Sequence, residues 1–393
     1  MRCTFLTISI LLKIYRKTSR LTKPQQSNSM KVYYTLIHSK LVLSFIKPSR
    51  KLFNGPLILH SNELESHVRN GLPEITRLKN VWFVPDLRAI YKDNGELIHS
   101  SVLKRGTIMC NIPPSNINVK QFTKTNVVDK ASFGGIMLGK HYGHFLIESL
   151  SRLWPLAIPD MANDFMNCKI LYWHRGKTTV SVEKAVIQPA QMILESLRIK
   201  SNINILGQPV YVSELLIPSQ ASIINNEFYS VFRDLLRLAG TGVILKNRQP
   251  QNDRKYPEKI YLSRTKLPYI RRNNGNEKQL ENKLKKCGFE IIHPQELSLL
   301  DQICIFNKAK VIAGSFGSAF HTMLLADISV QKIICLVDDC PDLTSTGIDR
   351  ICKAKTEYIR CMYPHPFCIK ESGSGATKDK IIDVDRALDG ILS

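Results

Sequence analysis

The stretch that decides the fold runs from 259 to 324, and it contains KIYLSR at 259–264, NEKQLENKLKKCGFEIIH at 276–293 and SLLDQICIFNKAKVIAGSFGSAFHTML at 298–324. Its short apolar runs predict strands at 259–263, 289–293 and 311–313. Helical spacing fills the intervals between these strands, and a further helix through Leu325 follows the last one. The order βαβαβα predicts a parallel sheet, which binds ligands at the carboxyl ends of its strands.

Both intervening helices have recognisable ends. The first is expected to begin after Asn276, with Gln279 closing a capping box, and to end at Gly288. The second is expected to begin after Ser298, three residues before Asp301. Each carries an inward apolar stripe, formed by Leu280, Leu284 and Cys287 in the first and by Leu299, Ile303 and Phe306 in the second.

The first half of the chain also alternates strand and helix patterns. Strands are expected at 81–84, 169–173 and 215–218, and a helix at 183–197. This alternation predicts an α/β layer. The segment 240–258 contains glycines and prolines among polar residues, which favours an interdomain linker. The predicted divisions are therefore a basic leader (1–55), an N-terminal α/β domain (56–245), a C-terminal Rossmann-like domain (246–365) and a C-terminal tail or helix (366–393).

Charge is concentrated at the N-terminus. The 393 residues carry a formal net charge of +22, and eleven basic residues precede the first acidic one, Glu63. The apolar run 4–12 is too short to span a bilayer and lacks a small-residue cleavage site. We therefore expect a cytoplasmic protein whose leader attaches to an anionic membrane surface, with a disordered leader or a transit peptide as alternatives. The remaining body is only moderately basic, which argues against nucleic-acid binding as the main role.

The ten cysteines are scattered without a Cys-x-x-Cys pair. This spacing disfavours a structural zinc site. Reduced thiols are favoured, although the group from Cys335 to Cys368 is compatible with disulfides in a secreted protein. No metal or other cofactor is expected.

The turn after the third strand is a candidate diphosphate site. Its residues Gly314, Ser315, Gly317 and Ser318 stand where a helix begins, so its free backbone N–H groups suit a phosphate. Arg264 ends the first strand of the same sheet, so the two are expected at one edge, where the guanidinium can pair with phosphate. The competing interpretations are a tight turn with nothing bound and a solvated arginine.

A second candidate site lies in the first half, where a glycine-rich turn leads into a helix. His144 and Glu148 are four residues apart on one helix face, with Arg152 a turn beyond. A histidine and a carboxylate so placed form a plausible acid/base pair for deprotonating a hydroxyl. A metal site that adds His141, or a capping histidine with a surface Glu148–Arg152 ion pair, are the alternatives.

Taken together, these segments resemble glycosyltransferase family 61, also known as the DUF563 family, whose members are inverting enzymes of the GT-B type. The likeness covers about 132–326 and rests on four stretches: 142–153, 260–264, 276–298 and 302–321. The resemblance implies two Rossmann-like domains facing a cleft and catalysis without a metal. It also implies that Arg264 holds the diphosphate of the donor and that the turn from Gly314 to His321 completes the nucleotide site. His144 and Glu148 would line the acceptor side as catalytic residues, with support from His141, Arg152 and Glu296.

Three positions depart from the family pattern. Glu148 stands where many relatives have Asp, Ser151 replaces a proline, and Phe316 stands where a histidine is usual. The favoured hypothesis is an inverting glycosyltransferase that moves a sugar from a nucleoside diphosphate to a hydroxyl of a growing or lipid-linked glycan in surface-polysaccharide (capsule-type) biosynthesis. A catalytically weakened glycan- or nucleotide-binding protein, which Phe316 favours, and a basic nucleic-acid-binding protein are the alternatives.

Overall fold

The computed structural model describes residues 58–125, 127–174, 176, 178–247, 255–268, 274–328, 331–364 and 380–393. The predictions for the leader at 1–55 lie outside these residues, as do most of those for the tail that begins at 366. Within the described ranges, no helix is both long and apolar enough to cross a membrane. The fold is α/β, as predicted, and contains two six-stranded sheets.

The stretch 259–324 supplies three of the six strands of the second sheet. Its strands lie in the order β1-β16-β15-β14-β12-β13. All neighbours are parallel except β1, which pairs antiparallel with β16. The strands are β1 (Ile58–His60), β12 (Lys259–Leu262), β13 (Glu290–Ile292), β14 (Val311–Ser315), β15 (Lys332–Val337) and β16 (Lys355–Arg360). Because β13 lies on one side of β12 and β14 on the other, the chain reverses its direction of travel across the sheet between β12 and β14, and ligands bind at such a point in open α/β sheets.

Two helices of this sheet, α9 (Glu277–Lys286) and α10 (Leu299–Lys308), begin and end close to the predicted positions, and the helix predicted through Leu325 is the 3-10 helix η11 (Ser318–Leu324). The sheet also carries α11 (Leu343–Cys352) and α12 (Val384–Leu392). The Ser298 side chain caps α10 by accepting from the Asp301 N–H. The capping box at α9 is wrong: the Asn276 side chain caps nothing and instead exchanges hydrogen bonds with the backbone of Ile382 in β18 (Lys380–Ile382). Gly288 follows α9 with φ 81°, the left-handed conformation that ends helices.

The first sheet has the order β4-β3-β10-β7-β8-β9. Strands β10, β7, β8 and β9 are parallel, and β3 and β4 are antiparallel additions. The strands are β3 (Ile75–Val84), β4 (Ala89–Lys92), β7 (Val127–Ile136), β8 (Lys169–Trp173), β9 (Ile203–Leu206) and β10 (Val210–Pro218). The helix predicted at 183–197 is interrupted at Val186, whose backbone is extended, so it forms α6 (Val182–Ala185) and α7 (Gln188–Ser196), with a proline in the first turn of α7.

Shorter elements complete the described chain. They are η2 (Ser61–Glu63), β2 (His67–Arg69), η3 (Pro85–Leu87), η4 (His99–Ser101), β5 (Lys104–Arg105), β6 (Ile108–Met109), η5 (Val119–Gln121), α4 (Tyr142–His144), η6 (Phe145–Ser149), η7 (Trp154–Ala157), α5 (Pro159–Met166), η8 (Lys200–Asn202), η10 (Pro294–Glu296), β11 (Glu227–Tyr229) and β17 (Met362–Pro364).

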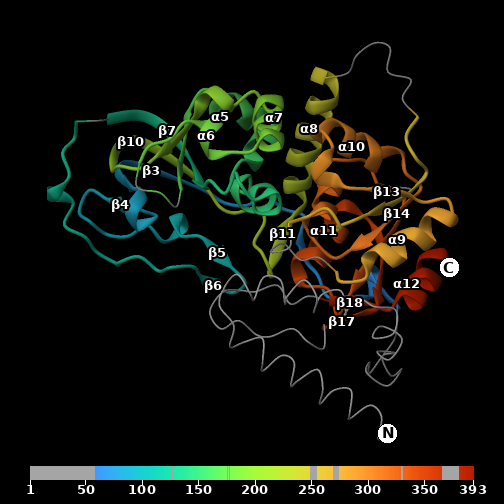
Figure 1. Ribbon diagram of the computed structural model, residues 1–393. Coiled ribbons are helices and arrows are strands. Elements are labelled where there is room, and N and C mark those ends of the chain that lie inside the picture. Colours follow the sequence, from blue (N-terminus) through green and yellow to red (C-terminus); the bar gives the residue numbers. More distant parts are fainter. Residues whose placement is uncertain are drawn as a thin grey trace, which may run out of the picture.

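The helix α8 (Ser230–Asn247) stands between the two sheets (Figure 1). It contacts α7 on one side and α10 on the other, and its buried residues belong to one apolar core that extends into both halves. A Cβ at Gly240 would lie 2.0 Å from the carbonyl oxygen of Leu325, so this glycine permits the close approach of α8 to the segment after β14. The predicted linker is therefore wrong at Gly240 and Gly242, which are helical, while its residues 248–254 lie outside the described ranges.

Candidate active site

The carboxyl ends of β12 and β14 bring Arg264 and the turn after β14 together, as the sequence predicts. The Arg264 guanidinium donates from Nη1 to the carbonyl oxygen of Phe316, at 3.3 Å. A Cβ at Gly317 would lie only 2.3 Å from the same Nη1. The glycine therefore leaves the space through which the guanidinium crosses the turn, at the point where the sheet order reverses.

The small residues of the turn do not all face outward. Ser315 is buried in β14, where its Oγ accepts from the Asn274 side chain at 2.8 Å. Gly314 is buried as well and packs against Leu262. Ser318 is exposed and begins η11, a seven-residue 3-10 helix. The groups that this edge presents are thus Arg264, Gly317 and Ser318.

A buried carboxylate lies beneath this edge. Glu277, in the first turn of α9, is fully buried, and its Oε1 accepts from the Tyr261 hydroxyl at 2.9 Å and from the backbone N–H of Arg264 at 3.3 Å. Its Oε2 has no hydrogen-bond partner among the described residues. Burial raises the pKa of Glu277 to about 7, against the opposing effects of the Tyr261 hydrogen bond and the Arg264 charge. Glu277 therefore holds the backbone of Arg264 while it retains a proton-sensitive, unpaired oxygen.

A second buried carboxylate supports the same loop. Glu281 accepts hydrogen bonds from the hydroxyls of Ser263 and Thr265, both at 2.6 Å, and Lys278 lies 3.1 Å from its other oxygen. Burial by itself would raise the pKa of Glu281, but these hydrogen bonds outweigh burial and the pKa is lowered. The two glutamates of α9 thus fix the residues on both sides of Arg264.

The His144 segment, which comprises α4 and η6 (142–149), packs directly on the turn after β14. The hydroxyl groups of Tyr142 and Thr322 are hydrogen-bonded at 3.0 Å. A Cβ at Gly143 would lie 2.7 Å from the Cβ of Ser318 and 2.9 Å from Nδ1 of His321. Nδ1 of His321 is enclosed without a hydrogen-bond partner in the described chain, and burial lowers the pKa of His321 to about 4. His321 is therefore neutral at pH 7 and can offer a phosphate a hydrogen bond but no charge.

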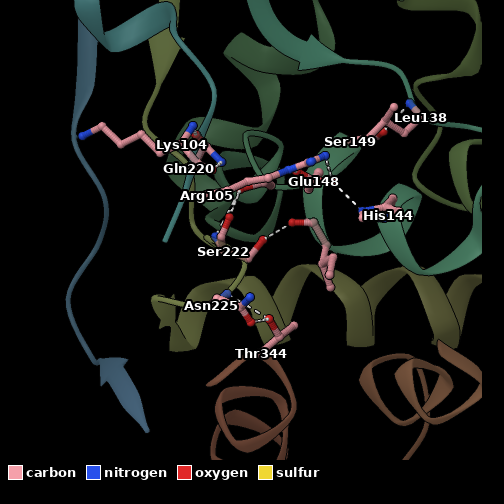
Figure 2. A network of polar contacts seen from close by, with 12 residues as sticks. Lys104, Arg105, Leu138, His144, Glu148, Ser149, Gln220, Ser222, Asn225 and Thr344 are labelled. Carbon is pink, nitrogen blue, oxygen red and sulfur yellow. Dashed lines mark hydrogen bonds and ion pairs between the residues drawn. The ribbon is translucent and has the colours of Figure 1, made fainter. Parts of the chain in front are cut away.

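His144 and Glu148 are in direct contact, as their spacing predicts (Figure 2). The His144 Nδ1 lies 2.6 Å from the Glu148 Oε2. The Arg105 guanidinium donates to both oxygens of the same carboxylate, at 2.6 and 2.9 Å. The Glu148 side chain is 1% exposed whereas that of His144 is 49% exposed. Burial alone would raise the pKa of Glu148, but the hydrogen bonds from His144 and Arg105 and the Arg105 charge lower it.

The charge state of Glu148 decides the orientation of the histidine. Because the ionised carboxylate can only accept hydrogen bonds, the Nδ1–H group of His144 donates a hydrogen bond to Glu148. When the ring carries a single proton, that proton lies on Nδ1 and Nε2 is left as an acceptor. This is the arrangement by which a buried carboxylate orients a histidine as a general base. The π-helical turn η6, an uncommon conformation that often occurs at functional sites, places the pair.

Residues 142–333 match the protein-family model described as Glycosyltransferase 61. This part of the chain is a glycosyltransferase family 61 region. The matched range begins directly before the His144 segment and contains the Arg264 edge and the turn after β14, so both parts of the candidate site belong to the family region, which indicates glycosyltransferase activity. A search of curated proteins finds no match to the chain.

Arg105 is the main site residue of this glycosyltransferase that sequence reasoning missed. It lies on the short β5–β6 hairpin, 43 positions before Glu148 and outside the matched range. Gln220 holds the hairpin by hydrogen bonds to both backbone groups of Lys104. In the segment that follows Gln220, Ser222 donates to the carbonyl oxygen of Ile147, and Asn225 accepts from Thr344 of α11 (Figure 2). No local pattern signals Arg105, because a single arginine in a turn resembles many solvated ones.

Arg152 does not form the ion pair that the sequence suggested with Glu148. It is buried, donates to the backbone carbonyls of Pro218 at 2.5 Å and Ser100 at 2.9 Å, and lies over the Phe133 ring. Burial lowers the pKa of Arg152 to about 9. Its contacts tie three segments of the first half together.

The two other supporting residues are exposed. The His141 ring lies 6.2 Å from that of His144, between centroids. Glu296 forms an ion pair with Lys266 at 2.6 Å, with both side chains about half exposed. Among the described residues no group of three or more His, Cys, Asp or Glu side chains could hold a metal ion. Both Glu148 oxygens accept from Arg105, so the carboxylate that a metal at His141 and His144 would need is already occupied.

Proposed function

We propose that this protein is an inverting glycosyltransferase that moves a sugar from a nucleoside diphosphate to a hydroxyl of a growing or lipid-linked glycan. The observation that carries the proposal is the contact between the two motifs: the His144 segment packs on Ser318 and His321, directly beside the edge that presents Arg264. This contact supports a single site in which His144 acts as the base and Arg264 binds phosphate.

The donor diphosphate would bind at the carboxyl ends of β12 and β14. Arg264 supplies the positive charge, and a guanidinium can take two phosphate oxygens at once. The exposed backbone at Gly317 and Ser318 and the neutral His321 supply hydrogen bonds. Charge on the departing diphosphate would be neutralised chiefly by Arg264, and this supports catalysis without a metal or other cofactor.

The acceptor hydroxyl would be deprotonated by His144. Its Nε2 takes the proton while Glu148 orients the ring and stabilises the imidazolium that forms, and Arg105 keeps Glu148 ionised and fixed. Attack by this oxygen on the anomeric carbon, opposite the diphosphate, breaks the bond to the donor in one displacement and inverts the configuration. His144 is thus the catalytic base, and Glu148 is a positioning residue.

The two sheets support a GT-B arrangement of two Rossmann-like domains facing a cleft. In the second sheet the parallel strands follow a doubly wound order, and in the first the order β9-β8-β7-β10 is that of half a dinucleotide-binding fold. A cytoplasmic location at an anionic membrane surface, with a role in surface-polysaccharide biosynthesis, remains part of the proposal and rests on the basic N-terminal sequence.

A nucleotide-binding experiment tests the donor site. Thermal unfolding is followed with a panel of nucleoside diphosphates and their sugars, with and without EDTA, for the natural protein and for Arg264→Ala. A ligand at about one hundred times its Kd should stabilise the protein by roughly 2.7 kcal/mol. We expect a selective shift that survives EDTA and is lost in Arg264→Ala.

The matched control is Arg237→Ala. Arg237 lies on α8, and its side chain is 37% exposed and forms an ion pair with Asp327. The variant should retain the full shift. If no nucleotide stabilises the folded natural protein, or if Arg264→Ala responds as Arg237→Ala does, the donor-site proposal is wrong.

A further inference from the structure

A small pocket on the first half has no role in the mechanism above. It has a volume of about 50 Å³ and is lined by Arg88, Leu103, Arg105, Cys110, Asn111, Ile136 and Trp173. A volume of roughly 10–15 Å³ already admits one water molecule, so this pocket has room for a small oxyanion. It lies where β7 and β8 end, at the carboxyl edge of the first sheet.

The lining is positively charged, because it contains two arginines and no carboxylate. The Arg88 guanidinium lies over the Trp173 ring, 5.7 Å from the ring centroid, and has no hydrogen bond or ion pair to a described residue. Arg105 uses Nε and Nη2 for Glu148, so its Nη1 is left without a described partner.

Trp173 forms the inner wall of the pocket. Its side chain is almost completely buried, and its indole Nε1 has no hydrogen-bond partner among the described residues. The indole N–H resonance therefore reports on changes in this wall. Two guanidinium groups, of which that of Arg105 is also paired with Glu148, thus line one pocket.

The backbone fixes Arg88 rigidly. Its φ is 56°, the left-handed conformation that closes the turn η3, and its N–H donates to the carbonyl oxygen of Pro85 at 3.0 Å. The guanidinium is therefore presented by an ordered turn and packed on an aromatic ring, which reduces the entropy lost on binding.

We propose that this pocket binds an oxyanion, a carboxylate or a phosphate, carried by the acceptor. Arg88 and Nη1 of Arg105 would hold it against the wall formed by Trp173, and the acceptor glycan of this enzyme would then contain an acidic sugar or a phosphate-bearing residue. Because Arg105 also clamps Glu148, which orients His144, the anion anchors the acceptor two side chains from the base. The claim that the anion belongs to an acceptor rests on the proposed function, but binding of an anion to this pocket can be tested without measuring transfer.

The experiment follows the indole N–H resonances by nuclear magnetic resonance in the full chain, which contains three tryptophans. Glucuronate, inorganic phosphate and glucose are added separately, up to tens of millimolar and without donor. Trp173→Phe identifies the resonance of Trp173. Arg88→Asn identifies it a second way, because it removes the guanidinium that lies over the ring, and asparagine tolerates the left-handed backbone.

We expect the Trp173 resonance to move with glucuronate and not with glucose, and the Kd for glucuronate to rise at least about tenfold in Arg88→Asn, since a charge-assisted pair is lost. The matched control is Arg198→Asn, another arginine with left-handed backbone, at φ 59°, that does not line the pocket. It should bind as the natural protein does.

A response to phosphate but not to glucuronate supports the oxyanion site and assigns a phosphate-bearing acceptor. The proposal is overturned if neither anion moves the resonance, if glucose moves it equally, or if Arg88→Asn binds unchanged. Since no transfer is measured, these outcomes are independent of whether the protein proves to be a glycosyltransferase with His144 as its base.

Discussion

The proposed donor edge, formed by Arg264 and the turn 314–318, and the His144–Glu148 pair are built in different ways. The side chains at the proposed donor edge come from one continuous stretch of about sixty residues, between Tyr261 and His321, and the glutamates beneath Arg264 lie on the helix that follows it. The proposed base, by contrast, depends on Glu148, which is held by an arginine from a distant hairpin. A site made from one continuous βαβαβ stretch can be predicted from the sequence, whereas a site made by tertiary contacts cannot.

The largest expected effect is at the base. His144→Ala should lower kcat by roughly 10²–10⁴ while the KM for the donor changes little, because general base catalysis is lost and the Arg264 edge is untouched. Steady-state kinetics with the donor identified by thermal shift measures both constants. Stability should be preserved, since the side chain is half exposed. If His144→Ala instead raised only the KM for the donor and left kcat unchanged, His144 would contact the donor and would not be the base.

Next is a substitution that disturbs only the donor edge. Gly317→Ala places a Cβ 2.3 Å from the Arg264 Nη1, so the guanidinium must move. We expect the nucleotide Kd to rise about 10- to 100-fold, in keeping with the loss of one or two charge-assisted hydrogen bonds. Gly71→Ala is the matched control, because a Cβ there meets nothing within 4 Å. Calorimetric titration compares the two, and equal affinities would contradict the donor role of this turn.

The two regions should respond to pH in opposite directions. The pKa of Glu277 is raised to about 7, so its favourable contribution to folding is complete below its unfolded pKa, near 4.5, and is lost as pH rises through about 7. Glu277→Gln should remove that loss, which amounts to about 3 kcal/mol at most at high pH. The pKa of Glu148 is lowered, so its contribution exists above the unfolded value and is lost as pH falls.

Urea unfolding from about pH 3 to pH 9 separates these contributions. Glu277→Gln should flatten the profile between its unfolded pKa and about pH 7, where the natural protein loses stability as pH rises. Glu148→Gln should flatten the profile below the unfolded pKa of that carboxyl while it destabilises the protein at pH 7. Because the pKa of Asp349 in α11 is also raised to about 7 by burial, Asp349→Asn serves as a comparison with a carboxylate remote from both motifs. Identical profiles for the natural protein and Glu277→Gln would show that the buried oxygen is not proton-sensitive.

The smallest effect is expected at Glu296. Its ion pair with Lys266 is half exposed, and such pairs contribute less than about 1 kcal/mol. Glu296→Ala should therefore change neither the unfolding midpoint nor kcat beyond error. A clear fall in kcat would instead place this residue in contact with substrate.

The sequence predicted the second sheet well because its signals are local. Apolar runs, the Ser298 cap and the left-handed Gly288 fixed the elements, and the parallel order placed Arg264 beside Gly317. The failures have tertiary causes. Asn276 does not cap the helix because its side chain is hydrogen-bonded to the backbone of Ile382. Gly240 lies inside helix α8, where the carbonyl oxygen of Leu325 leaves no room for a Cβ.

The candidate site likewise combines a local contact with long-range ones. The His144–Glu148 contact follows from an i to i+4 spacing. Arg152, one helical turn after Glu148, was expected to pair with it, but its guanidinium is buried and donates to backbone carbonyls instead. Arg105 and the buried oxygen of Glu277 depend on burial and on long-range packing, which no short pattern encodes.

The shared helix α8 makes the two halves energetically inseparable. Since its buried residues fill one core with both sheets, melting either sheet exposes apolar surface of the other. Calorimetry should accordingly record a single cooperative heat-absorption peak, with a van't Hoff enthalpy equal to the calorimetric one, and a nucleotide bound at the donor edge should protect amide hydrogens of the first sheet from exchange with solvent.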